Sequence, residues 1–533
     1  MRTKILSPDS YDDMQLAGEI LRSGGLVAIP TETVYGLAAN ALNPEAVKNI
    51  YVVKGRPSDN PLIVHINNFE DMKPLVREIP KAARLLAAAF WPGPLTIILP
   101  KTDIIPDQTS GGLDTVAIRF PSHPVARAII AAAKCPLAAP SANLSGKPSP
   151  TEFRYVFDDL FGKVEAIVDG GDCEVGVEST VITLATPVPK VLRPGGITVE
   201  QLREVLGEVE VDDAVINKLK DNEEAASPGM KYKHYSPAAD ITIADVSLED
   251  YVKLVDSEEG AAALCFEGEE ELIKAPSVTF GKEYDGESQA QRLFAALNEL
   301  DEKGLKKVYA RCPKRRDVGL AVYNRLIRSA GFNVIKPEFT IMGLTGPTGA
   351  GKSTVAQEFI RRGAAVVDCD ALSKSSKVYD EYCIAELQAN FGFDIAPQGV
   401  LDRRELARRA FSDPEGKAKL EKVVFPYIMA AIRAEIDCYK AQGKKLILLD
   451  APTLFEAKAD RLCSKILVVN APELVRLDRI VKRDKISTKD ALLRIKAQMR
   501  PHEFLKRADF VIDNSGEKDI ARQVSEILDS GLV

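Results

Sequence analysis

The chain has 533 residues, of which 45% are hydrophobic and 28% charged, a composition typical of a globular protein too long for a single core. Its formal net charge of −7 excludes a global basic field that would drive nucleic-acid binding, although local basic patches are still allowed. No apolar run approaches the roughly 18 residues of a membrane span, and we expect no secretory signal. Its 8 cysteines form no CxxC pair and its 4 histidines show no zinc spacing, so we expect reduced thiols in a cytoplasmic protein without a structural metal.

Apolar runs alternate with amphipathic stretches over residues 1–210. "GGLVAIP", "PLTIILP" and "DTVAIRFP" predict strands, whereas "AVKNIYVVKG" and "KAARLLAAAFW" predict helices. This alternation indicates an α/β domain. The polar stretch 211–239 contains Ser-Pro-Gly and Ser-Pro steps that cannot continue a helix, and we interpret it as a linker.

A smaller α/β unit is expected over residues 240–338. There "AAALCF" and "KKVYAR" predict strands and "ESQAQRLFAALNEL" predicts an amphipathic helix. A third α/β unit over residues 339–533 opens with the predicted strand "FTIMGLT" and the predicted helix "KSTVAQEFIRRG".

A phosphate-binding motif joins that strand to that helix, because Gly346, Gly351, Lys352 and Ser353 satisfy GxxxxGK[ST]. Loop and helix N–H groups would surround phosphates, Lys352 would reach the β- and γ-phosphates, and Ser353 would hold Mg²⁺. A glycine-rich turn without a ligand is the alternative. The residues expected to bind ATP are Gly346, Gly349, Ala350, Gly351, Lys352, Ser353 and Thr354.

Two carboxylates follow in "AAVVDCD", where Asp368 and Asp370 are expected at the carboxyl end of a strand with i, i+2 spacing on one side. There they would serve Mg²⁺, for which Asp368 is the candidate, and a hydroxyl nucleophile; a solvated strand-end pair is the alternative.

A basic helix is predicted in "ELVRLDRIVKRDKIS", with Arg476, Arg479 and Arg483 on one face and Lys482, Arg494 and Lys496 nearby. Such a helix could close over phosphates, with an exposed basic face as the alternative.

Six stretches of the third unit, in order, resemble dephospho-CoA kinase: "GLTGPTGAGKSTVAQEF", "VVDCDALS", "LDRRELARRAFSDP", "LDAPTLFE", "RIVKRD" and "ADFVIDNSG". The resemblance covers about residues 341–530 and implies ATP-dependent phosphorylation of the 3′-hydroxyl of dephospho-CoA. It makes Asp370 the base, with Lys352 catalytic and Arg479 and Arg483 on the phosphates. Two departures, Phe425 where many members have histidine and Thr453 in "LDAPTLFE", concern the acceptor pocket. A kinase that acts on another acceptor, such as a nucleoside or a small alcohol, is the competing hypothesis.

The first 340 residues contain polar clusters of their own. Lys54 and Arg56 in "KGRPSDN", and Ser141 and Asn143 in "APSANLSGKPSP", would each share a side if the chain is extended. Such a set suits a triphosphate or a carboxylate, and a solvated turn is the alternative.

Together these stretches resemble the threonylcarbamoyl-AMP synthase family with its YrdC-like fold. The resemblance rests on "IPTETVYGLAANA", "KGRPSDNPLIVHI", "WPGPLTIIL", "DTVAIRFPSHP", "APSANLSGKPSPT", "GVESTVI", "VLRPGGIT" and "SPGMKYKHYSP", and spans nearly all of residues 5–337. It implies the conversion of threonine, bicarbonate and ATP into threonylcarbamoyl-AMP and pyrophosphate, with other proteins transferring the threonylcarbamoyl group to tRNA.

The resemblance also implies site residues. Lys54 and Arg56 are implied as catalytic, and Met230, Lys231 and Tyr235 as a lid, for which a plain tether is the alternative. The residues implied for threonine are Thr33, His65, Arg119 and Ser179. The residues implied for ATP are Arg56, Asn60, Thr115, Ser141, Asn143, Ser149 and Arg193.

The sequence therefore predicts an α/β protein with a YrdC-like twisted open sheet, a small Rossmann-like domain and a P-loop kinase domain. We expect a bifunctional enzyme that uses ATP with Mg²⁺, L-threonine, bicarbonate and dephospho-CoA, without strong direct nucleic-acid binding. In the competing hypothesis the first 340 residues are a double-stranded-RNA-binding module, against which the negative net charge counts.

Overall fold

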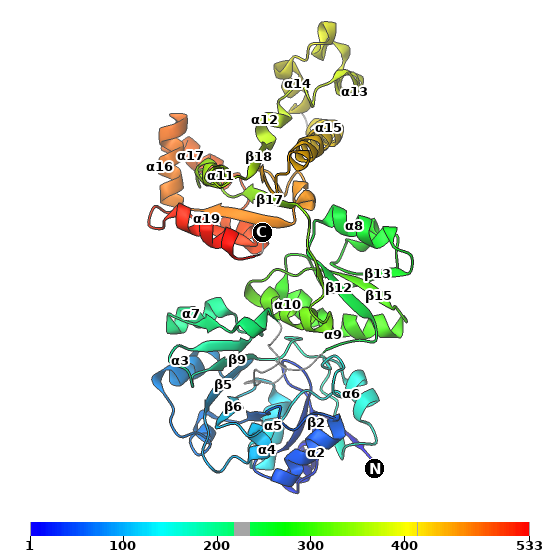
Figure 1. Ribbon diagram of the computed structural model, residues 1–533, viewed down its shortest axis with the longest axis vertical. Coiled ribbons are helices and arrows are strands. Elements are labelled where there is room, and N and C mark those ends of the chain that lie inside the picture. The colour runs from blue at the N-terminus through cyan, green and yellow to red at the C-terminus, as the bar shows by residue number, and fades with distance from the viewer. Residues whose placement is uncertain (1, 218–234, 413, 532–533) are drawn as a thin grey trace. The chain divides into compact units, whose positions relative to one another are not determined.

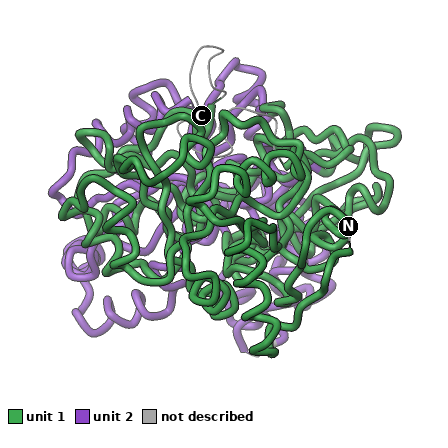
Figure 2. Tube along the Cα trace, turned by 90° about the horizontal axis from the view of Figure 1, so that it is seen from below, with its two compact units in different colours: residues 1–244, 252–335 green, residues 245–251, 336–533 purple. Residues whose placement is uncertain are grey.

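The protein forms two compact α/β units in its computed structural model, which describes residues 2–217, 235–412 and 414–531 (Figures 1 and 2). Unit 1 comprises residues 1–244 and 252–335, and unit 2 comprises residues 245–251 and 336–533. The finer division at residues 210, 239 and 338 stays a prediction. Within the described ranges, no helix is both long enough and apolar enough to cross a membrane.

The larger sheet of unit 1 has eleven strands in the order β1-β8-β2-β3-β7-β4-β6-β5-β9-β10-β11. It is mixed, because β4 runs parallel to β6 whereas β5 runs antiparallel to it. The strands are β1 Lys4–Leu6, β2 Val27–Ile29, β3 Gly36–Asn40, β4 Ile63–His65, β5 Leu95–Pro100, β6 Thr115–Arg119, β7 Leu137–Ala138, β8 Ala166–Val168, β9 Thr180–Thr183, β10 Lys190–Arg193 and β11 Glu210–Val211.

Seven α-helices belong to this part of the described chain: α1 Tyr11–Arg22, α2 Pro44–Lys54, α3 Lys81–Phe90, α4 Asp107–Ser110, α5 Pro124–Ala133, α6 Phe153–Leu160 and α7 Val199–Leu206. The helices α1 and α5 pack so closely that a Cβ on Gly18 would lie 2.5 Å from the Ala132 side chain. The predicted strands at 24–30, 94–100 and 114–121 and helices at 46–55 and 81–91 are confirmed.

The helix α2 shows why Lys54 and Arg56 do not share the extended geometry that the sequence suggested. The Asn43 side chain accepts hydrogen bonds from two N–H groups of the first turn, and Pro44 favours the helical start. The helix ends at Gly55, whose φ of 62° is the left-handed conformation that favours glycine. Lys54 is therefore the last helical residue and Arg56 follows the cap, so the expected i, i+2 strand spacing is wrong.

The smaller sheet of unit 1 is fully parallel, with the strand order β14-β13-β15-β12-β16. Side chains of the N-terminal part, including Val34 and Val177, join the core around Phe294 and Leu326 of this domain. The two parts of unit 1 therefore share apolar packing. The strands are β12 Asp240–Ala244, β13 Ala261–Cys265, β14 Ser277–Thr279, β15 Lys307–Arg311 and β16 Val334–Ile335. The helices are α9 Gly286–Glu302, α10 Asp317–Ser329 and α8 Leu248–Ser257, whose first turn falls in unit 2.

Unit 2 contains a parallel sheet of five strands in the order β18-β19-β17-β20-β21, with helices on both faces (Figure 1). Ile341 and Val468 join one core cluster whereas Met342 and Leu467 join another, as side chains that alternate along a doubly covered sheet must. The strands are β17 Thr340–Thr345, β18 Ala365–Asp368, β19 Leu446–Asp450, β20 Lys465–Asn470 and β21 Phe510–Asp513.

The α-helices of unit 2 in the described ranges are α11 Lys352–Arg361, α12 Cys369–Ser373, α13 Glu381–Phe391, α14 Arg403–Ala410, α15 Pro414–Ala441, α16 Glu473–Asp484, α17 Thr488–Lys496, α18 Pro501–Arg507 and α19 Ile520–Asp529. The helix α12 corrects a second expectation. The strand β18 stops at Asp368, whose Oδ1 caps α12 by accepting from the Ala371 N–H at 2.9 Å, so Asp370 lies in a helix and not on the strand.

Candidate active sites

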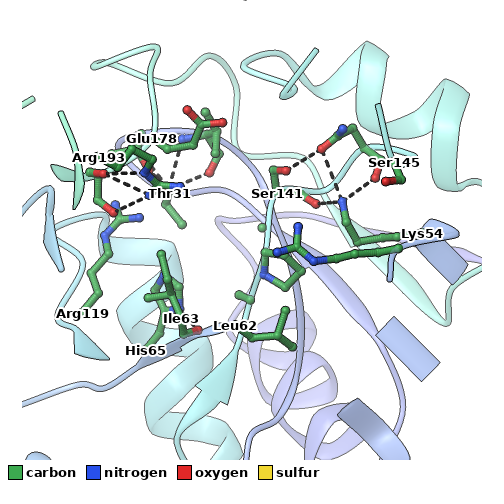
Figure 3. Close-up of a pocket in the computed structure, with 18 of the residues that line it drawn as sticks. Thr31, Lys54, Leu62, Ile63, His65, Arg119, Ser141, Ser145, Glu178 and Arg193 are labelled. Atoms are coloured by element: carbon green, nitrogen blue, oxygen red, sulfur yellow. Dashed lines mark hydrogen bonds between the residues drawn. The ribbon is translucent and has the colours of Figure 1, made fainter. Parts of the chain in front are cut away.

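A cleft in unit 1 brings together most of the polar residues singled out in its sequence (Figure 3). Its volume is about 750 Å³ including the open mouth. The predicted residues that line it are Thr33, Lys54, Arg56, His65, Arg119, Ser141, Asn143, Ser179, Arg193 and Tyr235. Segments more than 200 positions apart along the chain therefore meet in one place.

Lys54 connects the end of α2 to the loop that carries Ser141 and Asn143. Its Nζ donates to the carbonyl oxygens of Ser141 and Asn143, the latter at 2.5 Å, while the Ser141 hydroxyl donates to Asn143 Oδ1 at 2.5 Å. Burial, together with the charge of Arg56, lowers the pKa of Lys54. Arg56 donates to the Pro61 carbonyl at 3.3 Å and keeps its Nε without a partner among the described residues.

Arg119 and His65 stand side by side because β6 and β4 pair in parallel with these two residues in register. The Arg119 guanidinium lies 2.8 Å from Glu32 Oε1, and both side chains are about 95% buried. Burial would raise the pKa of Glu32, but Arg119 offsets it and holds that pKa below its usual value. Burial and the Arg119 charge lower the pKa of His65 to about 3, so its imidazole is neutral at physiological pH.

Hydroxyl groups and Arg193 form a further part of the wall. The hydroxyls of Ser179 and Thr96 are 2.8 Å apart, and Arg193 donates to the Ser179 carbonyl at 3.0 and 3.1 Å and to its hydroxyl at 3.2 Å. The Thr33 hydroxyl lies 2.9 Å from that of Thr31. The cleft thus presents guanidinium groups beside several rotatable hydroxyls, a combination that suits carboxylates and phosphates.

The second site is the loop between β17 and α11 in unit 2. Gly346, Gly349 and Gly351 have φ values of 139°, 79° and 90°. A Cβ on Gly346 would also lie 2.3 Å from the Val469 carbonyl oxygen, so this turn requires glycine. Lys352 begins α11 and its Nζ donates to the Gly346 carbonyl at 3.1 Å, which places its charge over the loop.

Asp368 and Asp450 lie next to this loop, because β18 and β19 end in register at these two residues. Burial and the nearby carboxylates Asp368 and Asp370 raise the pKa of Asp450, while Lys352 opposes that shift. Asp370 points its Oδ2 to Lys374 Nζ at 2.6 Å and is largely exposed. Asp368 and Asp370 therefore lie close enough to Asp450 to influence it at the carboxyl end of this sheet.

The basic helix α16 does not present its three arginines alike. Arg476 is buried and donates to the Ala471 carbonyl at 3.2 Å, whereas Arg483 is exposed and pairs with Asp484 at 2.7 Å. Arg479 donates to the carbonyls of Ala350 and Asn514 at 3.3 and 3.0 Å, and so contacts the loop directly. The predicted helix is confirmed, but its three arginines differ in exposure because Arg476 packs inward.

Comparisons with known proteins match different stretches of this chain to different families. A family model described as "Telomere recombination" matches residues 19–195, the model "Threonylcarbamoyl-AMP synthase, C-terminal domain" matches residues 197–331, and the model "Dephospho-CoA kinase" matches residues 340–519. The threonylcarbamoyl-AMP synthase of Pyrococcus abyssi is 44% identical over 333 residues, which cover 61% of this chain and 95% of that protein. The dephospho-CoA kinase of Corynebacterium diphtheriae is 38% identical over 189 residues, 35% of this chain and 94% of that protein.

This chain belongs to both families. It is therefore a bifunctional enzyme, with a threonylcarbamoyl-AMP synthase followed by a dephospho-CoA kinase. The crystal structure titled P. abyssi Sua5 complexed with L-threonine matches the synthase part with a TM-score of 0.59 and 41% identity, over 63% of this chain and 100% of that chain.

Several residues predicted for the synthase do not line its cleft. Ser149 is fully buried behind the wall, where its hydroxyl donates to Glu178 Oε1 at 2.5 Å. Asn60 is buried with an Oδ1 that has no partner among the described residues, and Thr115 starts β6. Tyr235, expected in a lid, is buried and does line the cleft, with its ring 5.3 Å from that of Phe294. Met230 and Lys231 lie outside the described residues.

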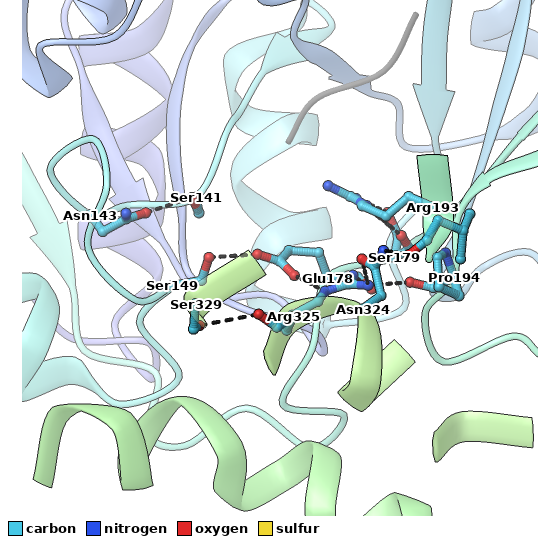
Figure 4. A network of polar contacts seen from close by, with 11 residues as sticks. Ser141, Asn143, Ser149, Glu178, Ser179, Arg193, Pro194, Asn324, Arg325 and Ser329 are labelled. Atoms are coloured by element: carbon cyan, nitrogen blue, oxygen red, sulfur yellow. Dashed lines mark hydrogen bonds and ion pairs between the residues drawn. The ribbon is translucent and has the colours of Figure 1, made fainter. Parts of the chain in front are cut away.

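The sequence analysis missed Glu32, Glu178 and Asp450. The two glutamates occur inside quoted motifs, "IPTETVYG" and "GVESTVI", where a charged residue in a largely uncharged stretch was the available signal. Asp450 ends the apolar run "LILLD", the same signal that identified Asp368. Arg325 of α10 gave no such signal, and it joins the synthase cleft only through the fold (Figure 4).

Proposed function

We propose that the cleft in unit 1 binds threonine, bicarbonate and ATP, and that its residues act by orientation and charge neutralisation. The carboxylate of N-carboxythreonine, formed from the threonine amine and bicarbonate with loss of water, attacks the α-phosphate of ATP. A new oxygen–phosphorus bond forms while the bond to the β-phosphate breaks, which releases pyrophosphate. No protein nucleophile is needed in this sequence, so placement of the two charged substrates carries the rate.

The threonine subsite is assigned to Arg119, His65, Thr33 and Ser179. Arg119 would clamp the threonine carboxylate, since a guanidinium matches the two oxygens of a carboxylate. The neutral imidazole of His65 offers a hydrogen bond without adding charge, in agreement with its lowered pKa. Arg119 already neutralises one carboxylate, that of Glu32, at 2.8 Å. This contact supports the assignment of Arg119 to a carboxylate ligand.

The triphosphate subsite is assigned to Arg56, Arg193, Ser141 and Asn143, with Asn60, Thr115 and Ser149 as further candidates. The unpartnered Nε of Arg56 is the observation that best supports this assignment, because a buried donor without a partner is costly unless a ligand completes it. Lys54 donates hydrogen bonds from its Nζ to the Ser141–Asn143 loop and so holds that loop in place.

For the kinase, the loop from Gly346 to Thr354 would hold the ATP phosphates and Asp370 would accept the proton of the 3′-hydroxyl of dephospho-CoA. The hydroxyl oxygen attacks the γ-phosphorus, the bond to the β-phosphate oxygen breaks, and ADP leaves. Lys352 and Arg483 would neutralise the transferred phosphoryl group. Phe425 and Thr453 leave another alcohol acceptor open, which the comparison of acceptors below tests.

The residues beside the kinase loop fit Mg²⁺. No group of three or more His, Cys, Asp or Glu residues arranged for a metal occurs in the described ranges. Mg²⁺ typically takes one or two carboxylates and completes its shell with water and phosphates, which the pair Asp368 and Asp450 with the Ser353 hydroxyl would allow. When bound, the ion would supply charge neutralisation for the phosphates.

We also propose that the adenylate product passes to proteins that modify tRNA, and that the enzyme works in the cytoplasm. The family resemblance supports the first proposal. The second is supported by the thiols, because none of the eight cysteines, all of which lie in the described ranges, forms a disulfide.

The full chain tests both activities. Pyrophosphate release should require threonine, bicarbonate and ATP together, and coenzyme A should form from dephospho-CoA and ATP in a separate assay. Pyrophosphate release that does not depend on threonine would overturn the synthase assignment. Phosphorylation of a nucleoside panel without phosphorylation of dephospho-CoA would overturn the acceptor assignment.

A further inference from the structure

Arg325 lies in the middle of α10, in the five-stranded domain of unit 1, and its side chain is completely buried. Its guanidinium makes several contacts with the wall of the synthase cleft (Figure 4). Nε donates to Glu178 Oε2 at 2.9 Å, Nη2 to the Glu178 carbonyl at 3.2 Å, and Nη1 to the Pro194 carbonyl at 2.5 Å. A residue from one domain thus fixes two loops of the other.

Glu178 lines the cleft and so connects Arg325 to it. Its Oε1 accepts from the Ser149 hydroxyl at 2.5 Å, and Ser179, the next residue, holds Arg193. Pro194 follows Arg193, so the carbonyl held by Arg325 adjoins the proposed phosphate clamp. The Arg325 guanidinium therefore positions two chain segments, one that carries Glu178 and one that carries Arg193.

We propose that Arg325 is a positioning residue of the synthase site, supplied by the five-stranded domain to hold Glu178 and the loop at Pro194 in the geometry that ATP requires. The inference rests on the proposed assignment of this cleft to ATP. Its consequence is that the second domain is a structural part of the active site and not an appended module.

Charge explains why an arginine is needed there. Glu178 is a buried carboxylate in a cleft that must accept a triphosphate, and an uncompensated negative charge would repel it. The groups that face Glu178 are Arg325, Arg193, Lys54, Tyr235 and the Ser149 hydroxyl. Burial would raise the pKa of Glu178, but Arg325 and Arg193 bring it down to about 2, so it remains ionised.

The test uses the full chain with Arg325→Met, Arg325→Lys, Glu178→Gln and the double variant Arg325→Met/Glu178→Gln. Arg328→Met is the matched control, because Arg328 also lies buried in α10 and reaches across to the Ala214 carbonyl, 2.8 Å away. Arg325→Met should raise the KM for ATP in pyrophosphate release at least about tenfold, since it leaves a buried charge partner unpaired. Arg325→Lys should retain part of the activity, and the double variant should recover part of it.

The pH profile separates positioning from a loss of packing. Without Arg325 the pKa of Glu178 rises, so the synthase rate of Arg325→Met should improve as the pH falls from 8 toward 6 relative to wild type, and the double variant should lose that dependence. Kinase activity of every variant, measured in the same preparation, should stay within about twofold of wild type.

Two results would overturn the inference. One is a wild-type KM for ATP in a folded Arg325→Met protein; the other is a loss equal to that of Arg328→Met with an unchanged pH profile and no recovery in the double variant. If Arg325→Met does not fold, the comparison of Arg325→Lys with Arg328→Met decides the matter in the same way. A wild-type chain that releases no pyrophosphate would instead overturn the proposed function.

Discussion

The two candidate ATP sites of this chain are built in opposite ways. The kinase loop is a backbone structure: its glycines adopt left-handed φ values, and its residues are contiguous over 346–354. The synthase cleft is a side-chain structure, assembled from residues as far apart as Thr31 and Tyr235 and held from behind by Arg325. A backbone site is local in sequence, whereas a side-chain site depends on the whole fold of its unit.

The largest effect should come from the lysine of the backbone site. Lys352→Ala should lower the kcat for coenzyme A formation about a thousandfold, because it removes the cation that neutralises the transferred phosphoryl group. Lys377→Ala is the control, since Lys377 is an exposed lysine of the same unit whose Nζ lies 2.7 Å from Glu435 Oε2. A loss below about tenfold would mean that the loop backbone alone supplies most of the stabilisation.

A distributed site should depend on more than one side chain. Arg119→Gln/Glu32→Gln, which removes a buried ion pair as a unit, should lower kcat/KM for threonine roughly 30-fold while the KM for ATP changes little. The control is Arg127→Gln, an exposed arginine of α5. An equal loss for both substrates would contradict separate subsites within the cleft.

Burial of ionisable groups should make unit 1 sensitive to acid. The folded pKa of His65, about 3, lies below its unfolded value near 6.5, so the unfolded state binds the proton first. The associated stability is complete above pH 6.5 and declines as the pH falls toward 3. Between pH 8 and pH 5 wild type should lose about 2 kcal/mol more of its free energy of unfolding than His65→Gln does.

The fluorescence of Trp91, the only tryptophan of the chain, reports this transition because it lies in unit 1. Equal acid sensitivity of the free energy of unfolding in the two proteins would show that His65 gains a proton without unfolding.

The smallest effect concerns the support of the backbone loop. Asn514 donates from Nδ2 to the Ala350 carbonyl at 2.7 Å, and a net hydrogen bond contributes about 1 kcal/mol. Asn514→Ala should therefore raise the KM for ATP of the kinase about fivefold, with Asn390→Ala, at an exposed position of α13, as the control. A change in the synthase KM would show that the variant disturbs more than this loop.

The difference between the sites also decides what the sequence could predict. Residues 346–354 are contiguous, so the motif alone predicted a loop that the structure contains. His65 and Arg119 meet through the parallel pairing of β4 and β6, which no local pattern records; only the family resemblance indicated them. The sequence could not indicate a role for Arg325, because an arginine in an amphipathic helix usually faces water and its partner Glu178 lies 147 residues away.

Two geometric expectations failed for local reasons that the sequence does record. Asp368 and Asp370 were assigned to one strand, yet an aspartate before "CDALS" is also a helix cap, and the cap decides the structure. Lys54 and Arg56 were assigned to an extended segment, yet Gly55 between them ends a helix. In both cases a capping residue outweighed the alternation of the strand.

The central claim is that one chain holds two ATP sites that work independently. Its most direct test measures pyrophosphate release and coenzyme A formation side by side on wild type, Lys54→Ala and Lys352→Ala from matched preparations. We predict that Lys54→Ala loses the first activity and keeps the second within about twofold, and that Lys352→Ala does the reverse. Loss of both activities from either substitution in a folded protein would contradict the claim.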